Sequence, residues 1–393
     1  MPPRHTRAGT RLFLLVGRPA LLPLLRWPAW TASLLWRPLE GGVVATIFRI
    51  VLVACQTASI IISWPVWHVR ANPPMLPMLP VPQVDVGPLL IGSLVLCVLA
   101  PRVGIFVHIA VLIAACIADQ TRLQPEFGSL ALLLLGTLPS YALRFVAINH
   151  LISLWWYAGF NKLLSQPFLT STADWMLEGF RANPLLRQIV YLPFTQTELL
   201  RGRFGYMIVA VEISLALLAI FPRTRKLCAT LAVLVHLGIF LVLSPLGHDW
   251  NAVVLPWNIA LALAGLSLIL PWREPFMQAW RLSHPAVRVF AVVLWLYPAG
   301  FYLGISDAYL AHNLYASNAP TEQRCNPQGG CVANTQASAT WKAFNVPLPP
   351  EPRLFTAYFQ ASCQPGERLV ILDKRPGVAW WGTALHEIAC DRQ

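Results

Sequence analysis

The sequence predicts an all-α polytopic membrane protein that carries a small C-terminal α+β domain outside the membrane. Three observations predict this fold class. Of the 393 residues, 56% are hydrophobic and only 12% are charged, about half the charged share of a soluble domain. Long apolar runs follow one another along most of the chain. Four cysteines are confined to its last part, between Cys325 and Cys390.

The apolar runs predict about nine transmembrane helices, because a helix needs about 20 apolar residues to cross a bilayer. Sixteen Trp and 34 Pro agree with this prediction, since Trp favours the membrane interface and Pro is tolerated in membrane helices. The second, third and fourth runs are short, and Pro139 interrupts the fourth. The runs are 43–67, 86–100, 103–118, 127–139, 142–164, 205–221, 227–246, 252–271 and 287–310.

Charge gives the expected orientation. Residues 1–42 form a basic arm, expected to lie in the cytoplasm and at the membrane interface. Lys and Arg are most frequent in the connections on the same side, including the turn at 223–226, as the positive-inside rule requires. We therefore expect a transmembrane domain over 43–311, with an outer lid at about 165–204, and a periplasmic domain over 312–393. This arrangement predicts a bacterial inner-membrane protein.

The cysteines fall into two groups. Four lie in or beside apolar runs, where Cys behaves as a small hydrophobic residue. The other four, Cys325, Cys331, Cys363 and Cys390, lie in the tail. An even number of cysteines in a small extracytoplasmic domain predicts disulfides, and four allow three pairings, which stay open. Within this tail we expect a short helix at 354–359 and a strand at 369–372.

Ionisable residues inside apolar runs are the candidates for chemistry, because burying them in a membrane is costly. His150 and Lys162 share one predicted helix, whereas Glu212 and His236 lie on consecutive antiparallel helices and could pair directly. Lys162 is either a lysine that reaches the headgroups or a general base in an outward-facing apolar pocket. Glu212 and His236 either tie two helices together or position and relay protons, and His150 is either a packing or a catalytic residue.

Other sites are not expected. The His248-Asp249 pair is too small a ligand set for a metal site, which needs three or four ligands. The basic residues form no groove suited to nucleic acid. We therefore expect a lipid bilayer as the main partner, no metal and no nucleic acid.

Two motifs resemble the signature of the horizontally transferred transmembrane (HTTM) domain, the membrane core of vitamin K-dependent γ-carboxylase. They are Tyr157-Ala-Gly-Phe-Asn-Lys-Leu163 and Asp174-Trp-Met-Leu-Glu-Gly179. Weaker matches follow in family order at 118–125, 211–213, 221–226 and 307–318, and His236 stands where the family has a membrane histidine. The second motif has one residue more than the family between Trp175 and Glu178.

The resemblance implies that Lys162 is the base that deprotonates a vitamin K-like quinol at the outer membrane face. It also implies a carboxylase-like or other quinol-dependent activity, in which Glu212, His236 and His150 assist. The expected quinol-binding residues are Trp156, Tyr157, Asn161, Asp174, Trp175 and Glu178.

Two other functions stay open. The helices could scaffold a membrane complex without catalysis, with the tail binding a periplasmic protein or peptide. A transporter is the third possibility, although no pair of interrupted helices related by an internal repeat is evident.

Overall fold

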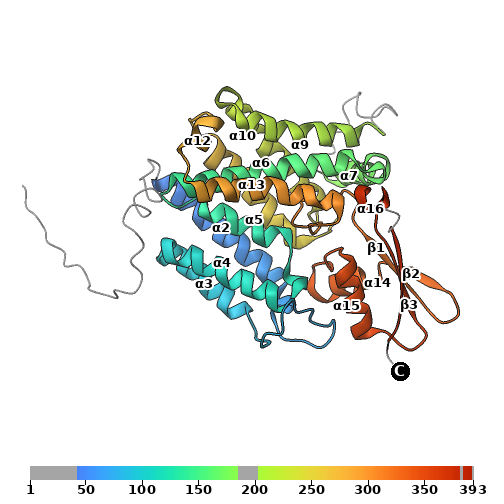
Figure 1. The fold of residues 1–393 in the computed structure, drawn as a ribbon. Helices are drawn as coiled ribbons and strands as arrows, with labels where there is room; N and C mark the ends of the chain where they lie inside the picture. The colour runs from blue at the N-terminus through green and yellow to red at the C-terminus, as the bar shows by residue number, and fades with distance from the viewer. Residues whose placement is uncertain (1–41, 185–201, 381–383, 392–393) are drawn as a thin grey trace, which may run out of the picture.

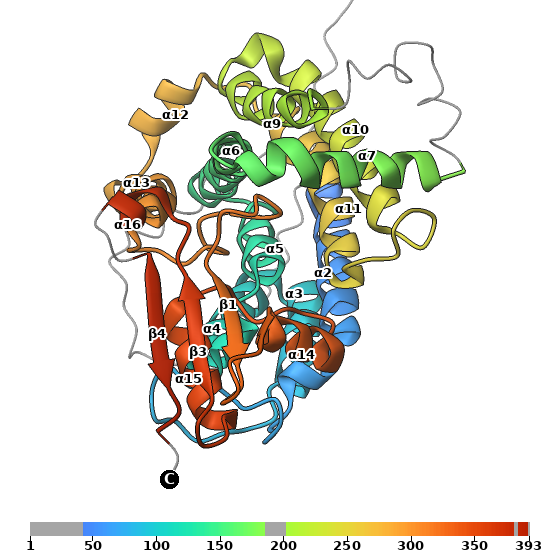
Figure 2. The ribbon, with the colours of Figure 1, turned by 90° about the vertical axis from the view of Figure 1, so that its right-hand side faces the viewer.

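The computed structural model describes residues 42–184, 202–380 and 384–391, and it contains a helical body and a small mixed domain, the cap (Figure 1). The long helices of the body run roughly parallel to one another, and the cap covers one end of them (Figures 1 and 2). The predicted basic arm at 1–42 lies outside the described residues, apart from Gly42. Much of the lid at 165–204 also does, because residues 185–201 are not described.

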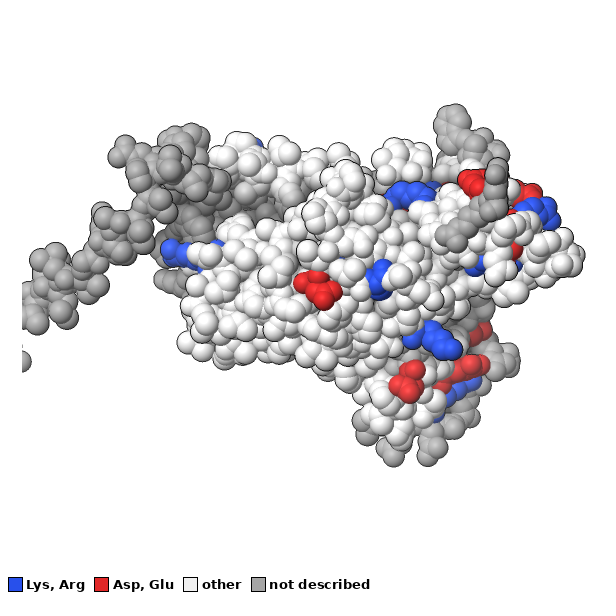
Figure 3. Space-filling model, turned by 90° about the horizontal axis from the view of Figure 1, so that it is seen from below, with Lys and Arg blue, Asp and Glu red and all other residues white. Residues whose placement is uncertain are grey.

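Each of the nine predicted apolar runs contains a helix. Within the described ranges, five helical stretches are long and apolar enough to cross a membrane. They are α2 (Gly42–Ile62), α4 (Pro101–Ala118), η5 with α10 (Pro222–Thr224, Arg225–Leu243), η6 with α11 and η7 (Ala252–Val254, Leu255–Ala264, Gly265–Ile269), and α13 with η8 (Pro285–Ala299, Gly300–Leu303). Figure 3 shows a broad helical flank with few charged side chains.

The helices in the other four predicted runs are shorter or more polar. α3 (Gly87–Leu99), α5 (Pro125–Leu135) and α9 (Phe204–Ile220) are apolar but short. The 13 residues of α3 rise about 20 Å, less than the roughly 30 Å of a bilayer core. α6 (Tyr141–Leu163) is long, but it carries several polar side chains. The described residues therefore contain five candidate membrane-spanning helices, whereas the number nine stays a prediction.

α6 is the central helix, with 17 of its 23 residues buried. It packs against α5, α9 and α13, so its surroundings are protein on most sides. The predicted break near Pro139 is present, because α5 ends at Leu135 and α6 begins at Tyr141. Ser140 caps α6 by accepting a hydrogen bond from the backbone N–H of Leu143, which satisfies one of the free donors at a helix start.

Four antiparallel strands in the order β2-β1-β3-β4 form the sheet of the cap. They are β1 (Thr321–Cys325), β2 (Cys331–Ala333), β3 (Arg368–Leu372) and β4 (Leu385–Ala389). The helices α14 (Thr335–Phe344), α15 (Pro352–Ser362) and α16 (Pro376–Trp380) accompany it. The expected helix and strand correspond to α15 and β3, and the other elements of the cap were not predicted.

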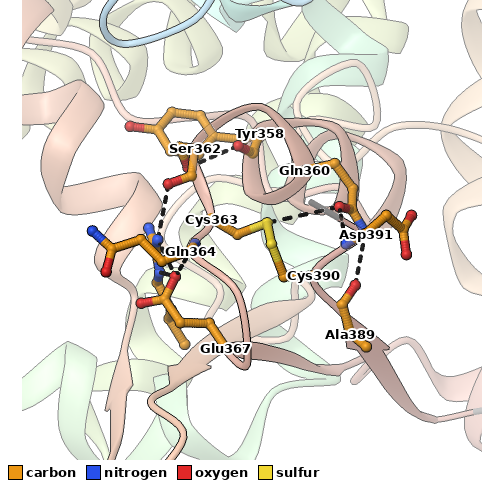
Figure 4. Close-up of a disulfide and its surroundings, with 10 residues drawn as sticks. Tyr358, Gln360, Ser362, Cys363, Gln364, Glu367, Ala389, Cys390 and Asp391 are labelled. Carbon is orange, nitrogen blue, oxygen red and sulfur yellow. Dashed lines mark hydrogen bonds and ion pairs between the residues drawn. A yellow bond between two sulfur atoms is a disulfide. The ribbon is translucent and has the colours of Figure 1, made fainter. Parts of the chain in front are cut away.

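The disulfides are Cys325–Cys331 and Cys363–Cys390. The first closes the β1–β2 hairpin, and the second joins the end of α15 to the end of β4. Beside the second disulfide, Gln360 donates to the carbonyl of Ala389 at 2.8 Å and accepts from the N–H of Asp391 at 3.1 Å (Figure 4). The last strand is therefore held to α15 by covalent and polar contacts together.

A buried ion cluster holds the turns beneath the cap. The carboxylate Oδ2 of Asp119 lies 2.6 Å from Nη2 of Arg70 and 3.7 Å from Nε of Arg122, a fully buried arginine. Arg122 also donates to the carbonyl of Val66 at 2.9 Å, and the guanidinium of Arg70 lies 4.3 Å from the ring centre of Phe344 in the cap. Because the charges are paired and hydrogen-bonded, they can be buried, and they tie the α2–α3 and α4–α5 connections to the cap.

A second polar contact joins the cap to the end of α13. Glu351 accepts a hydrogen bond from the backbone N–H of Ala308 at 2.6 Å and lies 3.5 Å from Arg375. Burial raises the pKa of Glu351 to about 7, and the neighbouring Asp307 adds to this rise, whereas Arg375 and Arg353 lower the pKa. The folded cap therefore binds a proton at Glu351 more tightly than the unfolded chain does.

Removal of the Cys363–Cys390 disulfide by a double Cys→Ser substitution should destabilise the cap more than removal of Cys325–Cys331. The two bonds span 27 and 6 residues, so loop-closure entropy predicts losses of about 3.5 and 2 kcal/mol. Thermal unfolding of the full chain, with alkylation to count free thiols, measures the difference. Equal losses, or disulfide-linked peptides of another pairing, would contradict it.

Glu351 should make the cap less stable as the pH rises. Its pKa is higher in the folded state, so the free energy of unfolding should fall between about pH 4.5 and 7, by roughly 1–3 kcal/mol in all. Glu351→Gln should remove this part of the slope, whereas Glu387→Gln, on the exposed face of β4, should keep it. Melting temperatures across this pH range provide the measurement, and an unchanged slope in Glu351→Gln would refute the assignment.

Candidate functional site

A cavity of about 410 Å³ lies among α6, α9, α10, α11 and α7 (Ala173–Ala182). Its walls are almost entirely apolar and include Phe204, Met207 and Leu215. The charged side chains on its wall are those of Lys162 and Glu212, and the imidazole of His236 also lines it. Three of the four predicted catalytic residues therefore meet at one cavity.

Lys162 and Glu212 form a buried ion pair. The amine Nζ of Lys162 lies 2.8 Å from both carboxylate oxygens of Glu212 and also contacts the carbonyl of Ala158 at 3.4 Å. The two residues are 4% and 7% exposed, so Lys162 does not extend into solvent. The amine is held between a carboxylate and apolar walls, which contradicts the snorkelling interpretation.

Gly159 lets the two helices approach closely enough for this ion pair. A Cβ at Gly159 would lie 2.8 Å from Cγ1 of Ile213 and 3.2 Å from Cβ of Glu212, closer than side chains normally pack. Lys162 follows Gly159 by three residues, so both lie on the same side of α6. A small residue at this position therefore places the backbone of α9, and with it Glu212, beside the amine.

His236 is held by a separate set of hydrogen bonds. Its Nε2 accepts from the indole N–H of Trp155 at 3.0 Å, and its Nδ1 lies 3.1 Å from Oδ1 of Asn258. The amide of Asn258 is oriented by donation from Nδ2 to the carbonyl of Val254 at 3.0 Å. Because Nε2 accepts, the proton of a neutral ring lies on Nδ1 and is donated to Asn258.

These contacts differ from the direct Glu212–His236 pair that the sequence allowed. Glu212 is bound by Lys162, and both ring nitrogens of His236 have other partners. The physical reason is the relative position of the helices. The close contact at Gly159 brings α9 to α6, whereas His236 is directed toward α6 at Trp155 and toward α11 at Asn258.

The helix α7 covers one side of the cavity. Met176 and Phe180 line the cavity, whereas Glu178 is exposed on the opposite side of the helix. This amphipathic pattern is that of a surface helix with one apolar face. The described part of the segment 165–204 therefore contributes one wall of the cavity, and its role as an outer lid stays a prediction.

His150 lies elsewhere on α6. Its Nε2 shares a hydrogen bond of 2.8 Å with the hydroxyl of Ser129, which also accepts from the indole of Trp257. His150 precedes Lys162 by twelve residues, about 18 Å along a helix. It is not among the residues that line the cavity, and its contacts are those of a packed polar residue in a helix bundle.

The predicted quinol-binding residues do not line this cavity. Tyr157 donates to the carbonyl of Trp295 at 2.6 Å, and Asn161 donates to the carbonyl of Ala311 at 3.0 Å. Both residues therefore tie α6 to α13 and to the segment that follows it. Trp156, Asp174, Trp175 and Glu178 are also outside the cavity wall, and Trp175 stacks on His248 at 4.0 Å.

Sequence reasoning missed several residues of the site. Trp155, Asn258 and Tyr315 line the cavity beside the predicted residues. Asn258 was detectable, because it is a polar side chain inside the apolar run 252–271. Trp155 and Tyr315 gave no such signal, since aromatic residues are common at membrane interfaces.

The arrangement can bind an apolar molecule and exchange one proton with it. The amine Nζ of Lys162 lies 2.8 Å from both carboxylate oxygens of Glu212, close enough for a proton to pass between the two groups. The walls exclude water, which strengthens the electrostatic contact between the amine and a bound anion. Proton transfer inside an apolar cavity is thus the chemistry that Lys162 and Glu212 support.

Substitution of one partner of the Lys162–Glu212 pair should be more harmful than substitution of both. Lys162→Met and Glu212→Gln each leave an uncompensated buried group, and for a charge this costs about 3–5 kcal/mol. The double substitution Lys162→Met/Glu212→Leu should restore most of the loss. Unfolding in detergent measures the three variants, and Lys226→Met, at an exposed lysine, should change little. Additive losses in the double variant would contradict a direct pair.

Comparison of the chain with known family models, curated proteins and solved structures finds no match in any of the three. The inference of a function therefore rests on the side chains of the site. The buried amine–carboxylate pair and the apolar cavity around it are the features from which a function is inferred.

Proposed function

We propose that the chain is an HTTM-type membrane enzyme that uses a quinol, with Lys162 as the general base. The observation that carries the proposal is the amine of Lys162, held 2.8 Å from both oxygens of Glu212 in the wall of an apolar cavity. A volume of about 410 Å³ lies in the usual range for small-molecule sites. It suits a substituted ring with the start of an apolar tail.

A bound hydroquinone supplies a weakly acidic hydroxyl and reducing equivalents. With the shared proton on Glu212, the amine Nζ of Lys162 accepts a proton from a hydroxyl in the cavity. The resulting ammonium stabilises the negative charge left on that oxygen. His236, fixed by Trp155 and Asn258, supplies a rigid polar wall. On the side of the cavity covered by α7, the side chains of Met176 and Phe180 exclude water.

We further propose nine membrane spans, with the N-terminus in the cytoplasm and the cap in the periplasm of a bacterial inner membrane. The basic turn at 223–226 lies at the end of the body opposite the cap (Figure 1). The helix α9 begins beside the cavity and ends just before this turn. Two disulfides in the cap suit an oxidising compartment. The short α3 and α5 would span with neighbouring helices around them.

Lys162→Arg should abolish quinol-dependent turnover while the protein still folds and retains quinone, because a guanidinium keeps the charge but cannot act as a base. Loss of a general base predicts a decrease of about 10²–10⁴-fold. Mass spectrometry of copurified small molecules and oxygen uptake with added quinol measure binding and turnover separately.

Ala158→Phe should fill the cavity and expel quinone, whereas Ala114→Phe on the exposed face of α4 should not. Full turnover in Lys162→Arg, or wild-type protein without quinone, would refute the proposal.

A second candidate function is partner binding without catalysis. A cleft of about 760 Å³ lies between the cap and the helix ends. Trp250 and Trp341 line it and stack at 4.8 Å. The carboxylate of Glu126, also at this cleft, is 1% exposed, and its Oε1 has no hydrogen-bond partner among the described residues. A scaffold protein would lose its periplasmic protein or peptide partner in Trp341→Ala and would tolerate Lys162→Arg.

A further inference from the structure

A second pocket lies at the end of the helical body opposite the cap. Its volume is about 650 Å³. Four helix ends form it: the start of α2, the α3–α4 turn, the α5–α6 turn and the end of η7. It is far along the helices from the Lys162 cavity, and the two pockets share no lining residue. It is therefore a separate site.

Three arginines line this pocket: Arg49 on α2, Arg102 at the start of α4 and Arg144 at the start of α6. The lining contains no Asp or Glu among the residues that the structure describes. Arg144 donates to the carbonyl of Leu268 at 3.1 Å, and the described contact of Arg49 is a long one of 3.5 Å to Thr46. The Nε atoms of Arg49 and Arg144 are buried and have no hydrogen-bond partner among the described residues. The described lining of the pocket thus carries positive side chains and no negative one.

The rest of the wall is apolar. Phe48, Val103 and Leu270 are typical of it, and the adjoining outer faces of α2 and α4 carry exposed apolar residues such as Ile47 and Phe106. A ligand that satisfies both features needs an anionic group beside the arginines and hydrocarbon against the walls. Anionic phospholipids combine these two properties, and basic pockets between transmembrane helices bind their headgroups.

The depth of the arginines agrees with this ligand. Arg49 follows the start of α2 by seven residues and Arg144 follows the Ser140 cap by four, about 10 Å and 6 Å along the helices. The headgroup and the first acyl carbons of a phospholipid would cover the depth from the helix ends to these two arginines.

We infer that this pocket binds an anionic phospholipid, with its phosphate between Arg49 and Arg144, its headgroup at the Arg102 rim and an acyl chain along the apolar wall. The inference does not depend on the proposed enzyme, because it uses other residues at the other end of the helices. It adds a specific lipid site to the general contact with a bilayer.

The test uses the full chain in detergent, titrated with phosphatidylglycerol, with phosphatidylcholine and with inorganic phosphate alone. Native mass spectrometry counts bound lipid, and the melting temperature reports stabilisation. Wild-type protein should bind phosphatidylglycerol selectively. Arg49→Gln should weaken this binding about fivefold, and Arg49→Gln/Arg144→Gln about 25-fold, since each arginine is expected to contribute an equal factor to the affinity for anionic lipid. Arg223→Gln, at an exposed arginine outside the pocket, should bind as wild type does.

The single variant keeps the test valid if Arg144→Gln disturbs folding, because the hydrogen bond described for Arg49, to Thr46, is a long one of 3.5 Å. Arg49→Lys, which keeps the charge, should retain most of the binding. Equal binding of phosphatidylcholine, equal stabilisation by inorganic phosphate, or equal loss in Arg223→Gln would each overturn the inference. Undiminished phosphatidylglycerol binding by Arg49→Gln/Arg144→Gln would overturn it as well.

Discussion

A single buried ion pair between α6 and α9 organises the centre of this protein. Burial of Lys162 or Glu212 alone would be costly, so each requires the other at short range. The requirement fixes the relative position of two helices, and Gly159 makes that position accessible by removing the side chain that would hold them apart. The apolar cavity lies where the two helices meet, and α7, α10 and α11 close its remaining sides.

The same rule governs the polar residues around this centre. His236 satisfies both ring nitrogens within the protein, and Arg122 is fully buried because Asp119 and backbone carbonyls surround its guanidinium. Each polar cluster also joins segments that are distant in sequence. Polar contacts therefore provide the connections between helices that are otherwise packed through apolar surface, and the Asp119 cluster extends this arrangement to the cap.

The two ends of the helical body differ in the charged side chains that line their pockets. At the cap end, buried carboxylates such as Glu126 and Glu351 lie beside aromatic and backbone groups. At the other end, arginines surround an apolar pocket without acidic residues in its described lining. In the functions proposed above, the cavity near the cap exchanges protons and the pocket at the far end binds an anionic phospholipid. The two pockets share no lining residue.

The sequence by itself determined the apolar helices, the break before α6 and the presence of a cysteine-rich cap, because hydropathy, proline and cysteine placement are local properties of the chain. It also selected Lys162 and Glu212, since an ionisable residue in an apolar run is conspicuous without any structure. Only the tertiary structure decided their partners. Whether Glu212 meets Lys162 or His236 depends on helix packing at Gly159, and the pairing of Cys363 with Cys390 depends on the strand order of the cap. Both are contacts between distant segments, which no local pattern encodes.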